Sequence, residues 1–538
     1  MLIDARHLAP NAQLTCDVCI VGSGPAGTTI AQRLIGSRLS VILLEAGGTH
    51  YELGTQTLYR GRVVGDPYYR LDGCRWRMFG GSSNRWGGWC RPLDPVDYMQ
   101  RDWLPLSGWP ISAQHLERYE IDAAKLCELP NARFDLESWR DRMLPPFMVD
   151  DTNFENVVIQ HSLEPNFAQI HGPAVVAAAN IQTILHANVT QVVLDSESRR
   201  VRELEVATLT GRRFAVRAKA AVLAVGGIEN ARLLLASRSN RQSGVGNEFD
   251  MVGRCFMEHL HIALGHLAPM SARLDTGFYR RQAAADAKVR GMLAPTAAAQ
   301  ERHRLLSTSI GFEWPSFSLS TPFLGWPPAA MVGPVRLYNQ LRDRGYARTA
   351  GRIKSLTDRA WSMPSRIASR RRARKAAALA NLTSSESVLY SIYFRAEQAP
   401  DPANRVCLDE DRRDALGVPT TRLEWKIRPF DESSVVRWLE LLRRDLRAKR
   451  IGDVILPQTN GEAEGWRERV IGGPHHIGTT RMSADPRHGV VNADCRVHSV
   501  ENLYVAGSSV FATSGHANPT FTILCLALRL ADLLRDTL

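Results

Sequence analysis

The sequence predicts an α/β fold: a Rossmann-type nucleotide-binding domain, discontinuous along the chain, with a second α+β domain of sheet and helices. Three observations support this. A glycine-rich turn joins a strand to a helix near the N-terminus, a Gly-Gly pair marks a similar transition at 226–227, and a strand near the C-terminus ends in Gly-Ser-Ser. Because these segments are far apart, the chain must leave the first domain and return to it.

Residues 16–48, CDVCIVGSGPAGTTIAQRLIGSRLSVILLEAGG, predict a strand, a tight turn, a helix and a second strand. Gly22 permits the sharp turn, Gly24 lets the backbone approach a pyrophosphate, and Gly27 lets the helix pack on the strand. The helix N-terminus offers free N–H groups to phosphates. Glu45, 18 residues after Gly27, is placed to accept hydrogen bonds from a ribose. The motif does not separate NAD from FAD.

A second glycine-rich segment, RMFGGSSNRWGGW at 77–89, has two Gly-Gly pairs around Ser-Ser-Asn. Such a loop lets the backbone lie close to a flat or anionic ligand. The alternative is a flexible surface loop, but Trp76, Trp86 and Trp89 argue against it because such loops rarely carry several tryptophans. We therefore expect an ordered loop over a ligand.

Short β-rich runs from about residue 182 lead to the second Gly-Gly transition, in VGGIENARLLLAS. The nucleotide-binding chain therefore resumes after an excursion. We expect 12–120, 183–258 and 472–538 to form the nucleotide-binding domain. The ranges 121–182 and 259–471 are then expected to form the substrate domain.

The composition is that of a soluble enzyme, with 44% hydrophobic and 23% charged residues. No apolar run approaches the roughly 18 residues of a membrane-spanning helix, and the N-terminus lacks a signal-peptide pattern. We expect a cytoplasmic protein. The nine cysteines are scattered, and the single Cys16-x-x-Cys19 pair lies in a predicted strand, so we predict no metal site.

The formal net charge of +12 belongs mainly to one segment. Residues 336–375 hold 13 Lys and Arg against two Asp, and they are helix-prone with few apolar residues. Such an insertion could contact an anionic membrane or an acidic partner, or form a solvated arginine-rich face. It lacks the interleaved aromatic residues of a nucleic-acid platform, so we expect no nucleic-acid partner.

The C-terminal region contains two adjacent histidines, His475 and His476, in GGPHHIGTTRM. Further on, a predicted strand at 503–506 ends in Gly-Ser-Ser, and Asn518-Pro519-Thr520 opens an apolar helix for which Asn518 is a natural N-cap. His259 and His261 alternate on another predicted strand. No third ligand has a metal-like spacing, so the sequence favours structural roles for both.

These motifs resemble the glucose–methanol–choline (GMC) family of flavin-dependent alcohol oxidoreductases, in the style of its pyranose-oxidising branch. The matching stretches are GSGPAG with LLEAG, GGSSNRWGG, AVGGIENARLLL, VGRCFMEHL, and the tail from GPHHIGTTRM to ANPTFTI. The 259–470 region matches only loosely.

The resemblance implies that His475 is the catalytic base and Asn518 the second catalytic residue. His476 and His516 are candidates for the substrate pocket, although His516 could equally cap a turn. The implied FAD-binding residues are Gly22, Ser23, Gly24, Pro25, Ala26, Gly27, Glu45, Ala46, Gly80, Gly81, Ser82, Asn84, Arg85, Trp86, Gly87, Val189, Gly507, Ser508, Pro519 and Thr520. Arg85 stands where relatives often carry a flavin-linked histidine, so we predict non-covalent FAD.

The implied reaction is oxidation of a hydroxyl group of a sugar, glycoside or polyol, with hydride transfer to flavin N5. The sequence leaves the electron acceptor open between oxygen, a quinone and a redox protein. Three other functions stay open: a lyase or decarboxylase on the same fold, an NAD-dependent dehydrogenase, and a membrane-associated, quinone-linked dehydrogenase that uses 336–375.

Overall fold

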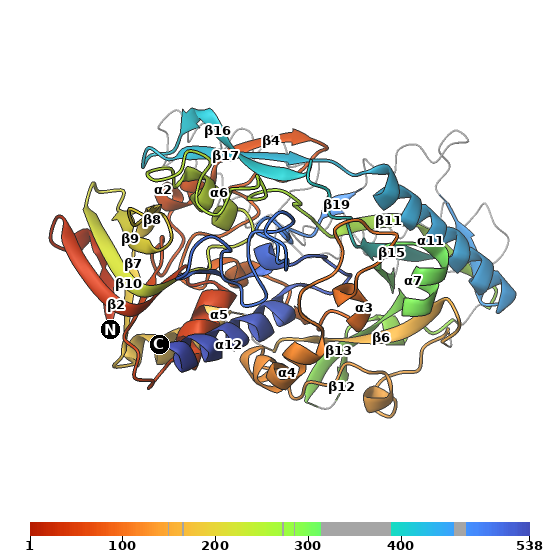
Figure 1. Ribbon diagram of the computed structural model, residues 1–538. Helices are drawn as coiled ribbons and strands as arrows, with labels where there is room; N and C mark the ends of the chain where they lie inside the picture. The colour runs from red at the N-terminus through yellow and green to blue at the C-terminus, as the bar shows by residue number, and fades with distance from the viewer. Residues whose placement is uncertain (149, 164–165, 272–273, 285, 314–388, 457–469) are drawn as a thin grey trace, which may run out of the picture.

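The computed structural model describes residues 1–538 except 149, 164–165, 272–273, 285, 314–388 and 457–469. The predicted basic insertion at 336–375 therefore lies outside the described residues. Within them, two large sheets stand at opposite ends of the molecule, with a small sheet across one side (Figure 1).

The first sheet carries the glycine motif. Its strands lie in the order β1, β7, β3, β2, β10, β9 and β8, and β20 pairs with β10. The pairs from β1 to β10 and that with β20 are parallel, whereas β9 and β8 are antiparallel additions. The bounds are β1 Leu2–Asp4, β2 Ala12–Val21, β3 Val41–Leu44, β7 Ile181–Leu185, β8 Asn188–Leu194, β9 Val201–Ala207, β10 Arg213–Leu223 and β20 Leu503–Val505.

Burial explains why these segments form strands. All four residues of β3 are buried, as are the last four of β2 and of β10, as expected for parallel strands covered on both faces. The carboxyl ends of β2, β3, β10 and β20 meet at one edge, which is the usual position of a ligand site in such sheets. Cys16 and Cys19 lie on β2, and every cysteine is a free thiol.

The second sheet is antiparallel, in the order β18, β11, β15, β14, β13, β6 and β5, with β12 paired to β13 and β19 to β11. Its strands are β5 Trp89–Cys90, β6 Phe154–His161, β11 Leu260–Pro269, β12 Gln282–Ala284, β13 Ala287–Pro295, β14 Thr308–Glu313, β15 Tyr390–Ala396, β18 Gly452–Ile455 and β19 Ile471–Gly472. The small sheet contains β4 Gly61–Gly65, β16 Arg405–Arg413 and β17 Pro419–Trp425.

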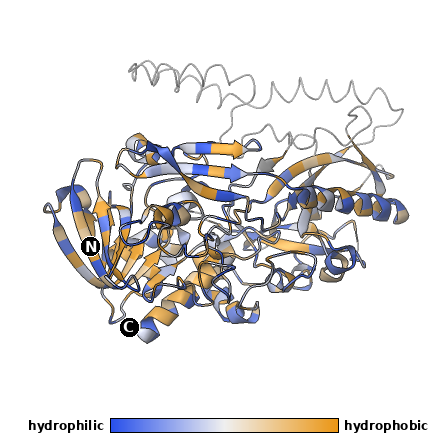
Figure 2. Cartoon of the chain, turned by 45° about the horizontal axis from the view of Figure 1, so that its top comes forward, coloured by the Kyte–Doolittle hydropathy of each residue, from blue (hydrophilic) through white to orange (hydrophobic). Residues whose placement is uncertain are grey.

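Helices cover both large sheets. On the first sheet, α1 (Pro25–Arg33) packs against α5 (Phe167–Ala177) and α12 (Thr520–Thr537), and α4 (Gln114–Leu126) packs on α12. Figure 2 shows hydrophobic and hydrophilic residues along α11 (Pro429–Ala448), which packs on β18 and β15 of the second sheet. The other described α-helices are α2 Leu53–Gln56, α3 Pro95–Tyr98, α6 Glu229–Ala236 and α7 Ala297–His303.

Several elements pair or pack across the predicted domain ranges. β1 precedes residue 12 and yet pairs with β7 in the first sheet, and α5, inside the predicted range 121–182, packs on α1. β5 lies inside the range 12–120 but pairs with β6 in the second sheet. These differences arise because distant partners, rather than local pattern, decide which sheet a short strand joins.

The beginning of α12 also differs from prediction. The helix begins at Thr520 with Pro519 as its N-cap, so Asn518 does not cap it. The Asn518 side chain instead makes two hydrogen bonds to other segments, described below. Among the described residues, no helix is long and apolar enough to cross a membrane, and no cluster of His, Cys, Asp and Glu could hold a metal ion.

Candidate active site

A cleft with an empty volume of about 940 Å³ opens at the carboxyl edge of the first sheet. Its walls come from the glycine turn after β2, the ends of β3, β10 and β20, and Val189 on β8. This position is typical of dinucleotide sites. The predicted cofactor residues in its lining are Gly22, Ser23, Gly24, Pro25, Ala26, Glu45, Ala46, Gly81, Ser82, Val189, Gly507 and Ser508.

The backbone of the cleft fits FAD. A Cβ on Gly27 would lie 1.9 Å from the carbonyl oxygen of Gly22, so the turn that brings α1 to the cleft requires glycine there. Gly507 has φ +113°, and a Cβ on it would meet no atom within 4 Å, so this backbone borders open space. The first turn of α1 supplies N–H groups without helical partners, which suit a pyrophosphate.

Glu45 is buried in the wall between β2 and β3. The backbone N–H and hydroxyl of Ser23 donate to its Oε2, and the backbone N–H of Gly47 donates to its Oε1 at 2.8 Å. These bonds fix the carboxylate at the cleft, where it retains acceptor capacity for a ribose.

Some predicted cofactor residues are absent from the lining. Asn84 donates to the carbonyl oxygens of Phe79 and Gly81, at 2.9 and 2.8 Å, and so holds the glycine loop in its turn. Arg85 is exposed and lies over the ring of Trp76, which does line the cleft. The others outside the lining are Gly27, Gly80, Trp86, Gly87, Pro519 and Thr520.

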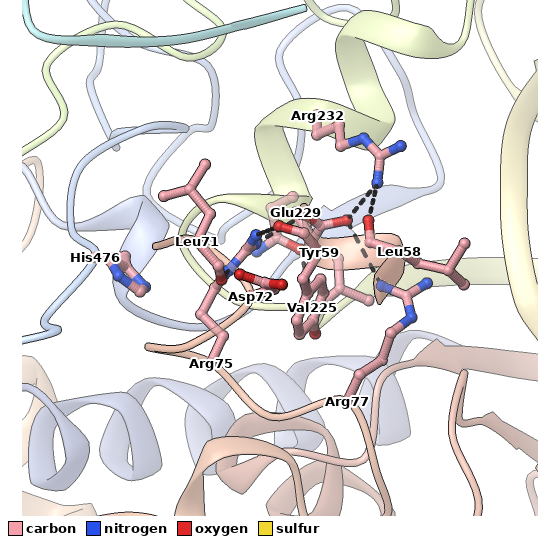
Figure 3. Close-up of polar contacts among 12 residues, drawn as sticks. Leu58, Tyr59, Leu71, Asp72, Arg75, Arg77, Val225, Glu229, Arg232 and His476 are labelled. Carbon is pink, nitrogen blue, oxygen red and sulfur yellow. Dashed lines mark hydrogen bonds and ion pairs between the residues drawn. The ribbon is translucent and has the colours of Figure 1, made fainter. Parts of the chain in front are cut away.

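The sequence analysis missed a cluster of buried charges beside the cleft (Figure 3). Glu229, at the start of α6, accepts from Arg75 at 2.7 Å and from Arg232 at 3.2 Å, and Arg77 lies 3.7 Å away. Arg232 also pairs with Asp414. Arg77 and Glu229 line the cleft, and three arginines against two carboxylates leave positive charge that suits an anionic ligand. The Arg-Trp-Arg run before the glycine loop was the available signal.

His475 and Asn518 meet although they are 43 positions apart. Asn518 Nδ2 lies 3.1 Å from His475 Nε2, and Asn518 Oδ1 accepts a hydrogen bond from Arg395 Nη1 at 2.9 Å. The hydroxyl of Ser508, in the cleft wall, donates to the carbonyl oxygen of His476 at 2.7 Å. The segment that carries the two histidines is therefore attached to the cleft.

Comparisons with known proteins match both ends of this arrangement. A family model described as FAD dependent oxidoreductase matches residues 17–246, which include the glycine turn, and one described as GMC oxidoreductase matches residues 400–527, which include both His475 and Asn518. The part of the chain that holds both candidate catalytic residues is therefore similar to the GMC oxidoreductases.

Two relatives and one solved structure illustrate the relationship. The 2-methyl-1,2-propanediol dehydrogenase of Mycolicibacterium austroafricanum is 24% identical over 96% of this chain and 94% of its own. The fructose dehydrogenase large subunit of Gluconobacter japonicus is 31% identical over 27% of this chain, a match that spans a quarter (25%) of that relative. Pyridoxine 4-oxidase from Mesorbium loti has a TM-score of 0.54 and 18% identity over 96% of this chain and 99% of its own. The predicted fold class is confirmed.

His259 touches His475 directly. Their Nδ1 atoms lie 2.8 Å apart, and His259 Nε2 lies 3.2 Å from the carbonyl oxygen of Ser514. The sequence favoured a structural role for His259, and the structure adds this contact with the candidate base. Alternation along a strand indicated which face His259 occupies, but it gave no sign of a contact 216 residues away.

One buried carboxyl group is bonded to the backbones of both His259 and His475. Glu258 Oε1 accepts the backbone N–H of His259 at 2.9 Å and that of His475 at 2.8 Å. Tyr68 donates its hydroxyl to Oε2 of the same carboxyl group. Burial raises the pKa of Glu258 to about 7, although these donors oppose the shift. The two backbones are thus tied to one side chain.

Burial favours the neutral form of the imidazoles around the site. Burial lowers the pKa of His475 well below its usual range, and His259, His261 and Arg395 add to the effect. Burial likewise lowers the pKa of His259 to about 4. A neutral imidazole has a lone pair that can accept a proton. The Asn518 amide beside the imidazole can donate an N–H to the oxygen atom of a hydroxyl group whose proton the imidazole accepts.

His476 and His516 stand apart from this pair. His476 Nε2 lies 3.7 Å from Cys74 Sγ, and its ring is near Phe256. His516 Nδ1 lies 3.0 Å from the hydroxyl of Ser307. Burial lowers the pKa of His476 to about 3 and that of His516 to about 4. The side-chain hydrogen-bond partners of these two histidines are thus Cys74 and Ser307 rather than His475 or Asn518.

Proposed function

We propose that this protein is an FAD-dependent oxidoreductase that converts a CH–OH group of a sugar, glycoside or polyol into a carbonyl group. The observation that carries the proposal is the His475 imidazole held 3.1 Å from the Asn518 amide, beside a cleft that fits FAD. The first sheet would bind the cofactor and the second sheet the substrate. The names of the relatives, a propanediol dehydrogenase and a fructose dehydrogenase subunit, support this substrate class.

His475 acts as the base in this proposal. Its Nε2 takes the hydroxyl proton, because a hydride leaves a carbinol carbon readily only as the oxygen loses its proton. When substrate is bound, an N–H of Asn518 Nδ2 donates to that oxygen instead of to Nε2, which frees the Nε2 lone pair and orients the carbon. FAD, when bound, accepts the hydride. Ser23, Glu45, the first turn of α1 and Arg77 would hold the cofactor.

Anaerobic mixing with pyranoses, glycosides, polyols and simple alcohols tests the reaction class. We expect loss of the oxidised flavin absorbance with at least one of these classes, since this half-reaction needs no electron acceptor. A protein that dithionite reduces normally, but that no alcohol reduces, would contradict alcohol oxidation and favour a lyase.

The pH dependence of flavin reduction should be flat near neutrality. The base must be unprotonated to act, and the pKa of His475 lies well below its usual range, so the active form persists as the pH falls from about 8 to about 6. The rate should fall only when the pH approaches the lowered pKa. Stopped-flow reduction across this range measures it, and a decline centred near the ordinary histidine pKa would contradict the assignment.

We propose that FAD is bound without a covalent link. Arg85 occupies the loop position predicted for attachment, is exposed and lies 4.4 Å from the ring centroid of Trp76. Since a guanidinium does not form the histidyl link, acid precipitation should release all flavin into the supernatant. Flavin in the washed pellet would contradict this prediction.

A further inference from the structure

Five groups form a continuous line of hydrogen bonds through the site. Arg395 Nη1 lies 2.9 Å from Asn518 Oδ1, and Asn518 Nδ2 lies 3.1 Å from His475 Nε2. His475 Nδ1 lies 2.8 Å from His259 Nδ1, and His259 Nε2 lies 3.2 Å from the carbonyl oxygen of Ser514. The line joins β15, the approach to α12, the 472–482 segment and the residue before β11.

The two ends of this line allow only one direction. A guanidinium can only donate, so Asn518 presents its oxygen to Arg395 and its NH₂ group to His475. A carbonyl oxygen can only accept, so His259 carries its hydrogen on Nε2 and leaves Nδ1 as an acceptor. His475 must then accept at Nε2 and donate from Nδ1. Both ends require the same tautomer of His475.

We propose that His259 is a positioning residue that holds His475 in the Nδ1–H tautomer, so that Nε2 carries a lone pair that a substrate hydroxyl can engage in place of the Asn518 N–H. The inference rests on the proposed role of His475 as base. The hydroxyl proton would pass to Nε2 and bound FAD would supply the hydride acceptor, so that the O–H and C–H bonds break as the C=O bond forms. The resulting imidazolium keeps its Nδ1–H bonded to the neutral acceptor on His259.

The surrounding groups keep His259 suited to this role. His475 is faced by His259 and His261 from the region of β11, by Arg395 from β15, and by its neighbour His476. Glu258 lies behind, bonded to the backbone N–H groups of His259 and His475. A protonated His259 would place a hydrogen on Nδ1 against the Nδ1–H of His475. Burial opposes that protonation.

Three variants of the holoenzyme test the proposal. His259→Leu removes the acceptor and should slow anaerobic flavin reduction on the order of 10²-fold, as expected when a base loses its tautomer-fixing partner. His259→Asn can place a carbonyl oxygen close to the original Nδ1 and should recover the rate to within about tenfold of wild type. His266→Leu makes the same change further along β11 and should leave the rate unchanged.

Solid-state ¹⁵N NMR of histidine-labelled holoenzyme reads the tautomer without any substrate. The His475 signals, assigned by their loss in His475→Ala, should show an unprotonated Nε2 in wild type and in His259→Asn. In His259→Leu, where only the Asn518 end still fixes the tautomer, a second population with a protonated Nε2 should appear. A protonated Nε2 in wild type would overturn the proposal, as would a His259→Leu variant with wild-type tautomer and rate. Wild-type protein with the expected tautomer that no alcohol reduces would instead refute the proposed oxidation.

Discussion

His475→Ala should reduce the rate of flavin reduction by substrate by about 10²- to 10⁴-fold, the usual contribution of a general base. The variant should still bind FAD, because His475 is not part of the cleft lining and the groups that would hold the cofactor are unchanged. Anaerobic stopped-flow absorbance, with flavin content measured for each preparation, gives the rate per bound cofactor.

The adjacent histidine provides the matched control. His476 lies in the same segment and is buried, but its ring lies near Phe256 and Cys74 rather than beside Asn518. His476→Ala should therefore reduce flavin at close to the wild-type rate once corrected for flavin content. Slow flavin reduction in His476→Ala together with a near wild-type rate in His475→Ala would contradict the assignment and make His476 the base.

Arg101→Ala should destabilise the folded protein by about 3–5 kcal/mol, the usual cost of leaving one partner of a buried ion pair without the other. Arg101 and Glu397 are only 1% and 0% exposed and form two hydrogen bonds, at 2.6 and 2.8 Å. Glu397 also accepts the backbone N–H groups of Ser307 and Gly515. Removal of the guanidinium would leave a buried, uncompensated carboxylate.

Urea or thermal unfolding of FAD-saturated protein measures this effect. Arg304→Ala is a suitable control because Arg304 forms an ion pair of similar length, 3.1 Å, with Asp102, and both side chains are largely exposed. Such surface pairs contribute roughly 0–1 kcal/mol. Similar losses in the free energy of unfolding for the two variants would show that the buried Arg101–Glu397 pair contributes no more to stability than an exposed ion pair.

The glycine turn and Glu45 could be predicted from sequence because a strand, a turn, a helix and a second strand lie within one continuous stretch. The His475–Asn518 pair required the family resemblance, since no local pattern places two residues from different segments together. Asn518 fits an N-cap by sequence, but Arg395 and His475 occupy its amide and the helix begins two residues later.

His259, Arg395 and Glu229 show where prediction from sequence ends. Each is a common residue type in an ordinary strand or helix pattern, and its role depends on partners more than 100 residues away. The sheet that a short strand joins is equally hard to predict from sequence. β1 and β5 are too short for their residue pattern to indicate a sheet, and pairing with distant strands determines which sheet each one joins.

The pairing of β20 with β10 also bears on how the protein acquires its cofactor. The cleft lining includes the glycine turn within the first 50 positions as well as Gly507 and Ser508, so the binding site spans a sequence separation of almost the whole chain. Contacts between such distant segments form slowly. The apoprotein must therefore bring its C-terminal strand onto the sheet before a complete cradle for FAD exists. FAD binding would therefore show that the C-terminal strand has joined the sheet, and bound FAD would stabilise this assembled state by mass action.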